Sequence, residues 1–427
     1  MHEVLRAREA RAQAQRELIA AHGCCVVSFS LNIPGPVKRF ALARAFYQSA
    51  LGDIEAALAA MGAAVAEKRE IGSVAGYECL LAVRGDALRV KRRMTQLEDG
   101  AQTGRLLDID VIAPDGSKLS RAEAGGQARL CFLCGRPAFD CARSREHSLE
   151  ALTGYVRRAL FEWYANGEAR RIGSTAVKAL LYEVAVTPKP GLVDRRNSGA
   201  HSDMDYFTFL DSAVAIAPYF EDCAHKGLIW DGAEPQALFY SLKESGIACE
   251  GAMTSATNGA NTHMGAIFSL GLLCAAAGVR SARGEAHAPQ SVCSLAGELA
   301  RAGFGANAEC AGLSGARREA ALGFPSALNT ALPELERRIA SGAGVNEAGA
   351  QALIALMANM EDANLLRRGG EAGLRHVQAR ASAIAGQADA GIADIEKLDR
   401  ELIGLNLSPG GCADMLAAAL LLWMLHK

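Results

Sequence analysis

The sequence lacks the patterns that mark several large classes of protein. It contains no Walker A motif, so the chain is not a P-loop enzyme, and it shows neither an internal repeat nor a low-complexity tract. The N-terminal stretch MHEVLRAREARAQAQREL is charged and helix-prone, unlike a secretory signal. The most apolar stretch, MLAAALLLWML near the C-terminus, is too short to span a bilayer and predicts a buried last helix. We therefore expect a cytoplasmic protein that does not contact a membrane.

An excess of one charge sign is absent as well. The net charge is −2; residues 1–165 carry 23 Lys and Arg against 19 Asp and Glu, and residues 166–427 carry 22 against 28. Neither half is basic enough to indicate a nucleic-acid partner. Twelve cysteines in a chain without an export signal indicate reduced thiols rather than a disulfide framework. The 427 residues, half of them hydrophobic, are typical of a globular protein with two or three domains.

The elements that are present change in character along the chain. Helices are predicted at 3–20, 41–62 and 149–164, and strands at CCVVSFSLNIPG, YECLLAV (77–83) and LLDIDV, so residues 1–165 predict a small α/β domain. The boundary is expected near Asn166-Gly167, without a long linker, and residues 166–427 predict an all-α domain, which makes the chain α+β overall. The helices expected there are 174–186, 205–219, 235–246, 263–277, 289–302, 329–340, 346–358, 371–385, 392–402 and 412–426.

Two carboxylates in the first half share one face of a predicted strand. Asp108 and Asp110 alternate with apolar residues, so both side chains point the same way and can hold one divalent cation. Such a cation can neutralise a triphosphate. The alternative is a solvated face of an edge strand. Arg105 and Arg121, which flank the pair, favour an anion site.

The segment CFLCGRPAFDCARSREH contains four soft metal ligands. Cys131, Cys134, Cys141 and His147 have the spacing C-x2-C-x6-C-x5-H, which suits a closed tetrahedral zinc site. Only one knuckle is present, so the interpretation that the sequence favours is three reduced cysteines in a packed loop. Cations near this segment and in the turn LNIPGPVKRF are candidate phosphate ligands: Lys38, Arg136, Arg143 and Arg145.

The stretch YEVAVTPKPGLVDRRNSGAHSDMD opens the second half with unusual charge density. Two prolines end a helix and predict a stiff, extended loop. Cations for phosphates together with carboxylates for magnesium suit a nucleoside-triphosphate site, whereas the alternative is a solvated loop. The candidates in this loop are Lys189, Asp194, Arg195, His201, Asp203 and Asp205.

Further polar segments begin or end predicted helices in the second half. These are TSATNGANTHMGAIFS, GARREAALGFP, MEDANLLRRGG and LNLSPGGCADMLA. Helix N-termini and glycine-containing turns offer backbone amides to anions. We expect these helix ends to share one cleft, with the candidates Asn261, His263, Arg317, Glu319, Asp362, Asn364, Arg367 and Ser408.

These segments resemble two known enzyme families. Nearly all of residues 1–165 resembles apo-citrate lyase phosphoribosyl-dephospho-CoA transferase. The segments that carry this resemblance are VVSFSLNIPGPVK, GYE, GRLLDIDV and CFLC…PAFDCARSREH. Residues from about 170 to 427 resemble triphosphoribosyl-dephospho-CoA synthase. The segments that carry this resemblance are LLYEVAVTPKPGLVDRRNSGAHSDMD, NTHMGAIFSLGLL, REAALGFP, EDANLLRRGG and LSPGGCADMLA. The two activities are consecutive steps of one pathway, so the resemblance implies a natural fusion.

The resemblance implies a magnesium-dependent, bifunctional enzyme. The helical domain would join ATP to 3′-dephospho-CoA with release of adenine. The first domain, nucleotidyltransferase-like, would pass phosphoribosyl-dephospho-CoA to a serine of the citrate lyase acyl carrier protein (the gamma subunit), releasing pyrophosphate. Asp108 and Asp110 would hold magnesium in the first domain. In the second, His201, Asp203 and Asp205 would be catalytic, the two aspartates would also be magnesium ligands, and Lys189, Arg195, Arg317 and Arg367 would clamp phosphates.

The chain departs from the family patterns at several positions. Ala101-Gln102-Thr103 stands where His-Pro is usual, Met264 replaces a lysine, and Ala363 replaces the threonine of D-T-N. Arg318 stands in the glycine position of R-G-E and offers an extra cation. Two alternatives remain open: the same chemistry for a malonate decarboxylase carrier, or a helical half that binds without reacting.

Overall fold

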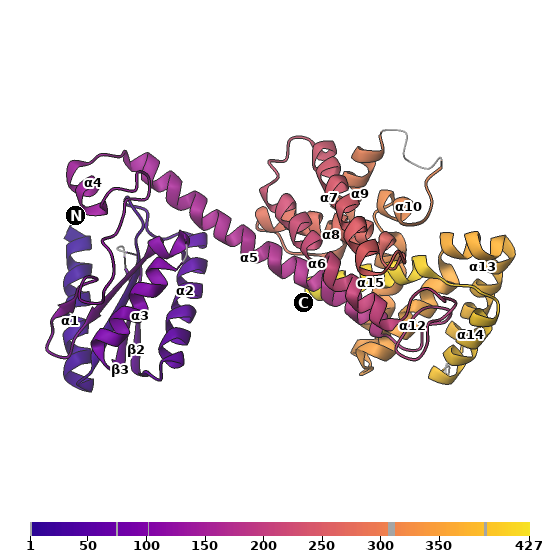
Figure 1. Ribbon diagram of the computed structural model, residues 1–427, viewed down its shortest axis with the longest axis horizontal. Helices are drawn as coiled ribbons and strands as arrows, with labels where there is room; N and C mark the ends of the chain where they lie inside the picture. The colour runs from indigo at the N-terminus through magenta and orange to yellow at the C-terminus, as the bar shows by residue number, and fades with distance from the viewer. Residues whose placement is uncertain (1, 74–75, 101, 306–311, 388–390) are drawn as a thin grey trace. The chain divides into compact units, whose positions relative to one another are not determined.

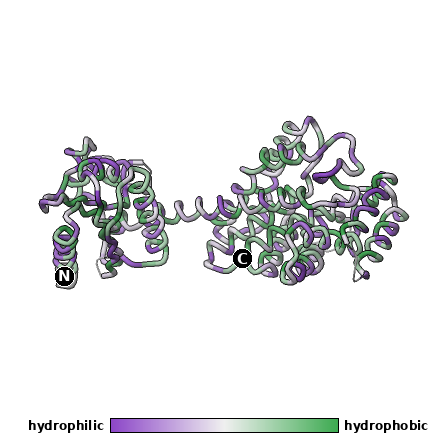
Figure 2. The backbone as a smooth tube through the Cα atoms, turned by 90° about the horizontal axis from the view of Figure 1, so that it is seen from below, coloured by the Kyte–Doolittle hydropathy of each residue, from purple (hydrophilic) through white to green (hydrophobic). Residues whose placement is uncertain are grey.

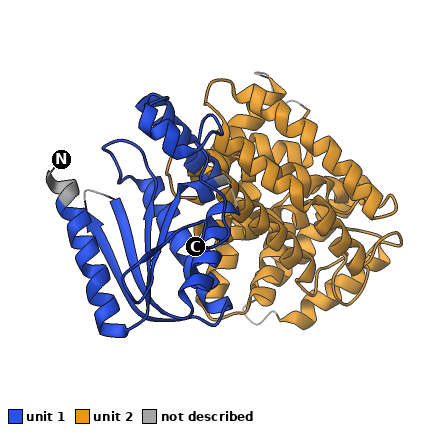
Figure 3. Ribbon diagram, turned by 60° about the vertical axis from the view of Figure 1, so that its left-hand side comes forward, with its two compact units in different colours: residues 1–164 blue, residues 165–427 orange. Residues whose placement is uncertain are grey.

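The chain folds into two compact units. The computed structural model describes residues 2–73, 76–100, 102–305, 312–387 and 391–427. Unit 1 comprises residues 1–164 and unit 2 residues 165–427 (Figure 3). Each unit is described by itself.

Unit 1 is built on a five-stranded sheet of order β2-β3-β1-β4-β5 (Figure 1). All strand pairs are antiparallel, so this unit is α+β rather than a parallel α/β domain. The strands are β1 (Cys25–Leu31), β2 (Ala64–Ser73), β3 (Gly76–Arg84), β4 (Leu107–Ile112) and β5 (Lys118–Leu119). The helices are α1 (His2–His22), α2 (Ala41–Ala60), α3 (Ala87–Asp99), the 3-10 helix η1 (Gln102–Leu106) and α4 (Ala138–Ser144).

The two faces of this sheet are covered by different helices. Val27 and Phe29 of β1 join the larger core with α2, α3 and the first part of α5 (Leu149–Ala185). Val26 faces the other way and packs with Leu18 of α1. Because paired residues share a face, Asp108 and Asp110 of β4, opposite Ser30 and Ser28, lie on the α1 face of the sheet.

Several features differ from the sequence prediction, which contained neither α3, α4 nor β5. β2 was not predicted, because its sequence AVAEKREIGS is charged; it is an edge strand, where charged residues are common. The helices predicted at 149–164 and 174–186 are one helix, α5. A glycine costs a helix only about 1 kcal/mol relative to alanine, so Gly167 does not end it. Gly173 is required where α5 meets α6, since a Cβ there would lie 2.7 Å from the Glu221 nitrogen.

Unit 2 consists of helices in the described residues, as predicted. Apolar and polar residues are interspersed along the chain of this unit (Figure 2). The Gly-Gly stop at the end of MEDANLLRRGG coincides with a kink, where Gly370 has φ 63°. The helices are α6 (Tyr206–Ile229), α7 (Pro235–Ala256), α8 (Met264–Ala282), α9 (Pro289–Phe304), α10 (Gly315–Ala321), the π-helix η2 (Ala327–Ala331), α11 (Leu332–Ala340), α12 (Val345–Asn359), α13 (Ala363–Ala385), α14 (Ile392–Gly404) and α15 (Gly410–His426).

α8 and α15 form the centre of unit 2. By length and composition alone α8 could cross a membrane, but 78% of its apolar window is buried inside the structure. The prediction of a buried last helix is confirmed, since most of α15 from Cys412 to Leu422 is inaccessible to solvent. The N-termini of both helices meet at the cavity described next.

Candidate functional site

Unit 2 contains a cavity of about 570 Å³. Its walls come from the end of α5, the loop after it, α7, α13 and the N-termini of α8, α10 and α15. These are the polar helix ends of the sequence analysis, so the prediction that they share one cleft is confirmed. Charged side chains of both signs line it: Glu183, Lys189, Asp203, Glu250, Arg317, Arg367, Arg368 and Asp414.

Lys189 lies at the wall of this cavity in a buried ion pair. Its Nζ is 2.5 Å from Glu183 Oε1, and the side chains are 1% and 4% exposed. The residues from Val186 to Asp194 are buried, so the loop expected to display its charges is packed inside. Burial raises the pKa of Glu183, and the Lys189 ammonium opposes that rise. The ammonium expected to clamp phosphate is thus already paired with a carboxylate of α5.

Asp414 is a cavity residue that the sequence analysis did not select as a site candidate. It lies in the second turn of α15 and accepts a hydrogen bond from the backbone N–H of Ala266, in the first turn of α8. Burial, then the charges of Glu183 and Asp362, raises its pKa well above the ordinary value. Gly265 allows this approach, because a Cβ there would lie 2.0 Å from Asp414 Oδ2. An acid within the first turn after S-P-G-G was the available signal.

His263 faces the cavity as a neutral imidazole. It is 3% exposed, and burial, with a smaller contribution from Lys189, lowers its pKa to about 3. Its Nδ1 lies 2.7 Å from Ser212 Oγ, while its Nε2 has no hydrogen-bond partner among the described residues. A buried nitrogen without a partner costs free energy, so Nε2 is suited to a hydrogen bond with a bound molecule. The neighbouring Asn261 also lines the cavity.

His201 and Ser408 form a second polar group in the cavity. His201 Nε2 is 2.9 Å from Ser408 Oγ, and its Nδ1 is 3.3 Å from Arg368 Nη2 and 3.8 Å from Asp203 Oδ1. Burial and then Arg368 lower the pKa of His201, which favours the neutral ring. The cations Arg317 and Arg367 and the amide of Asn364 line the same cavity.

Other candidates have structural partners and lie outside the cavity lining. Asp194 accepts hydrogen bonds from the backbone of Lys189, Arg196 and Asn197, which holds the loop turn. Asp205 is the N-cap of α6 in a capping box with Thr208.

The remaining three of these candidates hold neighbouring segments. Arg195 donates to Thr187 Oγ1 and Asn346 Oδ1, and Glu319 accepts from Ser326. Asp362 accepts through Oδ1 from the N-terminal amides of α13 and through Oδ2 from Cys412 of α15. These bonds account for all five residues without a substrate.

Two of the departures from the family patterns lie at the cavity. Met264 and Ala363 line it. Arg318 does not; it pairs with Glu361 at 2.9 Å on the surface, so it does not replace the missing lysine. Ala101 lies outside the described residues.

Unit 1 has a separate pocket of about 460 Å³ lined by three arginines, Arg105, Arg129 and Arg145. Asp108 Oδ1 is 3.1 Å from Arg129 Nη1. Asp110 Oδ2 is 2.6 Å from Lys118 Nζ. The two carboxylates share a face as predicted, but each has a cationic partner. Two further candidates, Lys38, whose Nζ donates to the Ile33 carbonyl, and Arg143, are not among its lining residues.

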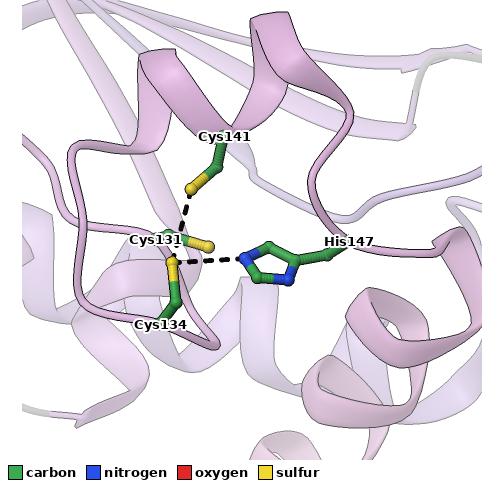
Figure 4. Close-up of side chains that lie close together, drawn as sticks. All are labelled: Cys131, Cys134, Cys141 and His147. Carbon is green, nitrogen blue, oxygen red and sulfur yellow. Dashed lines mark hydrogen bonds between the residues drawn. The ribbon is translucent and has the colours of Figure 1, made fainter.

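The four soft ligands of CFLCGRPAFDCARSREH converge beside this pocket (Figure 4). The sulfur and nitrogen atoms of Cys131, Cys134, Cys141 and His147 all lie within 4.8 Å of one another. The Cys134 and Cys141 sulfurs are 3.3 Å apart, and His147 Nε2 is 3.2 Å from Cys134 Sγ.

Two family models match the chain, one in each half. CitX, described as apo-citrate lyase phosphoribosyl-dephospho-CoA transferase, matches residues 1–163. CitG, described as ATP:dephospho-CoA triphosphoribosyl transferase, matches residues 169–308 and 305–427.

Two relatives match nearly the whole chain, and a third matches its larger part. The chain is 31% identical to Protein CitXG of Leuconostoc mesenteroides subsp. cremoris over 98% of its own length and 96% of the relative's. It is 31% identical to Protein CitXG of Haemophilus influenzae, over 97% of this chain and 94% of the relative. It is also 42% identical to the 2-(5''-triphosphoribosyl)-3'-dephosphocoenzyme-A synthase of Pectobacterium atrosepticum, over 60% of this chain and 88% of the relative.

Proposed function

The chain belongs to the CitXG family of fused transferases in citrate lyase prosthetic-group biosynthesis, and on that premise we propose how its two units divide the work. Unit 2 converts ATP and 3′-dephospho-CoA into 2′-(5″-triphosphoribosyl)-3′-dephospho-CoA and adenine. Unit 1 transfers phosphoribosyl-dephospho-CoA to a serine of the citrate lyase acyl carrier protein, the gamma subunit, and releases pyrophosphate.

The synthase site of this proposal is the cavity of unit 2. The observation that carries it is the meeting of helix N-termini, cations and buried carboxylates in one cavity of about 570 Å³. Arg317, Arg367 and Arg368 are the cations that would hold the triphosphate, because guanidinium groups bind phosphate oxygens in a bidentate manner. Asn261 and the partnerless Nε2 of His263 would hydrogen-bond the nucleotide.

Two groups whose pKa values are shifted in opposite directions suit the chemistry. The dephospho-CoA hydroxyl attacks the ribose carbon that carries adenine, so the hydroxyl loses a proton and adenine gains one. His201, whose pKa is lowered by burial, is a candidate base, and Asp414, whose pKa is raised by burial, is a candidate acid. Asp203, near His201, would stabilise the imidazolium that forms.

Magnesium fits this cavity only in part through the predicted residues. The Asp205 carboxylate caps α6, so the Asp203–Asp205 pair does not form a joint site. Asp203 and the nucleotide phosphates would hold the ion, since magnesium often takes few protein ligands. The ion would neutralise triphosphate charge.

The transferase site is proposed at the arginine-lined pocket of unit 1. Arg105, Arg129 and Arg145 would bind the triphosphate whose pyrophosphate leaves. Asp108 and Asp110 share one face and would hold magnesium, as expected of a nucleotidyltransferase-like site, if substrate draws Arg129 and Lys118 away. The attacking hydroxyl belongs to the carrier protein.

The first test compares two aspartates two residues apart. Adenine release from ATP, with and without 3′-dephospho-CoA, is measured for the wild type, Asp203→Asn and Asp205→Asn. We expect release to require dephospho-CoA, to fall at least about 100-fold in Asp203→Asn and to persist in Asp205→Asn, because asparagine is also a good N-cap. A mass increase of the carrier protein reports the second step. Folded wild type that releases no adenine would leave a transferase joined to a binding domain.

A further inference from the structure

The cysteine-rich segment of unit 1 holds its shape with almost no core of its own. Between Arg129 and Glu150 only Cys131 and Cys141 are fully buried, and half-buried Phe132, stacked on Tyr155, packs against the core of unit 1. Segments that bury so little apolar surface usually depend on a disulfide or a structural metal.

The backbone of this segment forms a ligand-presenting turn. Arg129 accepts a hydrogen bond from the Ala138 N–H, and Cys131 N–H donates to the Arg136 carbonyl, so residues 129–138 form a tight hairpin. Gly135, which follows the second cysteine, has φ 71°, a left-handed conformation that favours glycine. The chain thereby turns back, and the Arg136 N–H donates to Cys134 Sγ. Donors to the sulfur are the outer partners found around metal-bound thiolates.

The remaining two ligands come from separate elements. Cys141 lies in α4, which ends at Ser144, and His147 lies three residues after that end. A tetrahedral site with metal–sulfur bonds of about 2.3 Å and metal–nitrogen bonds of about 2.0 Å requires ligand atoms about 3.5–3.8 Å apart. The Cys134–His147 and Cys134–Cys141 separations, 3.2 and 3.3 Å, are slightly shorter than that spacing, and all four ligand atoms lie within 4.8 Å of one another, so one ion can reach them all after a small outward shift. Hairpin, helix and loop thus converge on one point.

We propose that Cys131, Cys134, Cys141 and His147 bind one zinc ion in a closed, structural site. Four protein ligands leave no position for water, so the ion holds structure rather than reacts. Cys131, Cys141 and His147 also line the pocket that contains Arg129 and Arg145. Zinc therefore fixes the wall that positions these arginines.

The metal content of the full chain tests this directly. The protein is purified with its affinity tag removed, under reducing conditions, from cells grown with added zinc, and metals are measured by mass spectrometry. We expect about one zinc per chain in the wild type and in Cys24→Ala, a control cysteine of the same unit, and at least about tenfold less in Cys134→Ser and His147→Ala. Cys134 is exposed, so its replacement removes a ligand and little packing. Far-UV circular dichroism and urea unfolding followed by Trp163 fluorescence show whether unit 1 of each variant remains folded.

Cobalt substitution identifies the ligands independently of activity. Cobalt(II) in the site should give thiolate charge-transfer and intense tetrahedral bands that weaken in Cys134→Ser. Wild type without zinc, a Cys134–Cys141 disulfide under reducing purification, or full zinc content in both ligand variants would each overturn the proposal.

Discussion

Replacing Lys189 separates its two interpretations, a buried structural cation and a phosphate clamp. In the structure Lys189 and Glu183 form an ion pair of 2.5 Å whose side chains are at most 4% exposed. Lys189→Met leaves the Glu183 carboxylate buried and unpaired. Loss of one partner of a buried pair costs about 3–5 kcal/mol. Both residues border a cavity that water can enter, so we expect the free energy of unfolding to fall by the lower end of that range, about 3 kcal/mol.

The double variant Glu183→Leu/Lys189→Met should regain most of that loss, because two apolar side chains leave no buried charge. Lys178→Met is the matched control: Lys178 is an exposed lysine on α5, the helix that carries Glu183, and its loss should change stability by less than about 0.5 kcal/mol.

Unfolding by urea, followed by tryptophan fluorescence, measures these differences. In a Trp163→Phe background the remaining tryptophans, Trp230 and Trp423, both belong to unit 2. The reasoning is refuted if Lys189→Met is as stable as its background while the KM for ATP rises about tenfold or more. That result would restore Lys189 as a direct phosphate ligand.

Three further variants test separate features of unit 2. Asp205→Ala should lose about 1 kcal/mol of stability, measured by urea unfolding, because a capping box is removed, with adenine release little changed. Gly265→Ala should reduce adenine release sharply at unchanged helix content by circular dichroism, because the new Cβ would displace Asp414; unchanged kinetics would argue against Asp414. His263 has a folded pKa of about 3, below its unfolded value, so the unfolded state binds more protons and stability falls as pH drops below about 6.5. Between pH 7.5 and 5 this residue should contribute a loss of about 2 kcal/mol that His263→Gln lacks, measured by urea unfolding at both pH values.

Much of the fold was predictable because local patterns agree with it. The alternation of Leu107 to Val111 predicted the face that Asp108 and Asp110 share. β2 was missed because pairing with β3, rather than its charged sequence, makes it a strand. The continuity of α5 was missed because packing on both sides of Gly167 outweighs a weak local signal.

The sequence predicted which segments line the cavity of unit 2 better than it predicted what each residue in them does. The helix ends were found because polar residues and glycine mark them. Which carboxylate caps a helix, as Asp205 does, and which enters the cavity, as Asp414 does, depends on how distant helices meet. The Glu183–Lys189 pair could not be recognised as buried, because prolines and charges ordinarily mark an exposed loop.

Asp362 holds two helices of the cavity wall together without lining the cavity itself. One carboxylate, fully buried, binds the N-terminal amides of α13 with one oxygen and of α15 with the other. The Asp362 carboxylate thus links the N-terminus of α13, which carries Arg367, to the N-terminus of α15, which carries Asp414, beneath the cavity surface. A substitution at a neighbouring position such as Ala363 can therefore leave the distance between α13 and α15 unchanged, because Asp362 sets that distance.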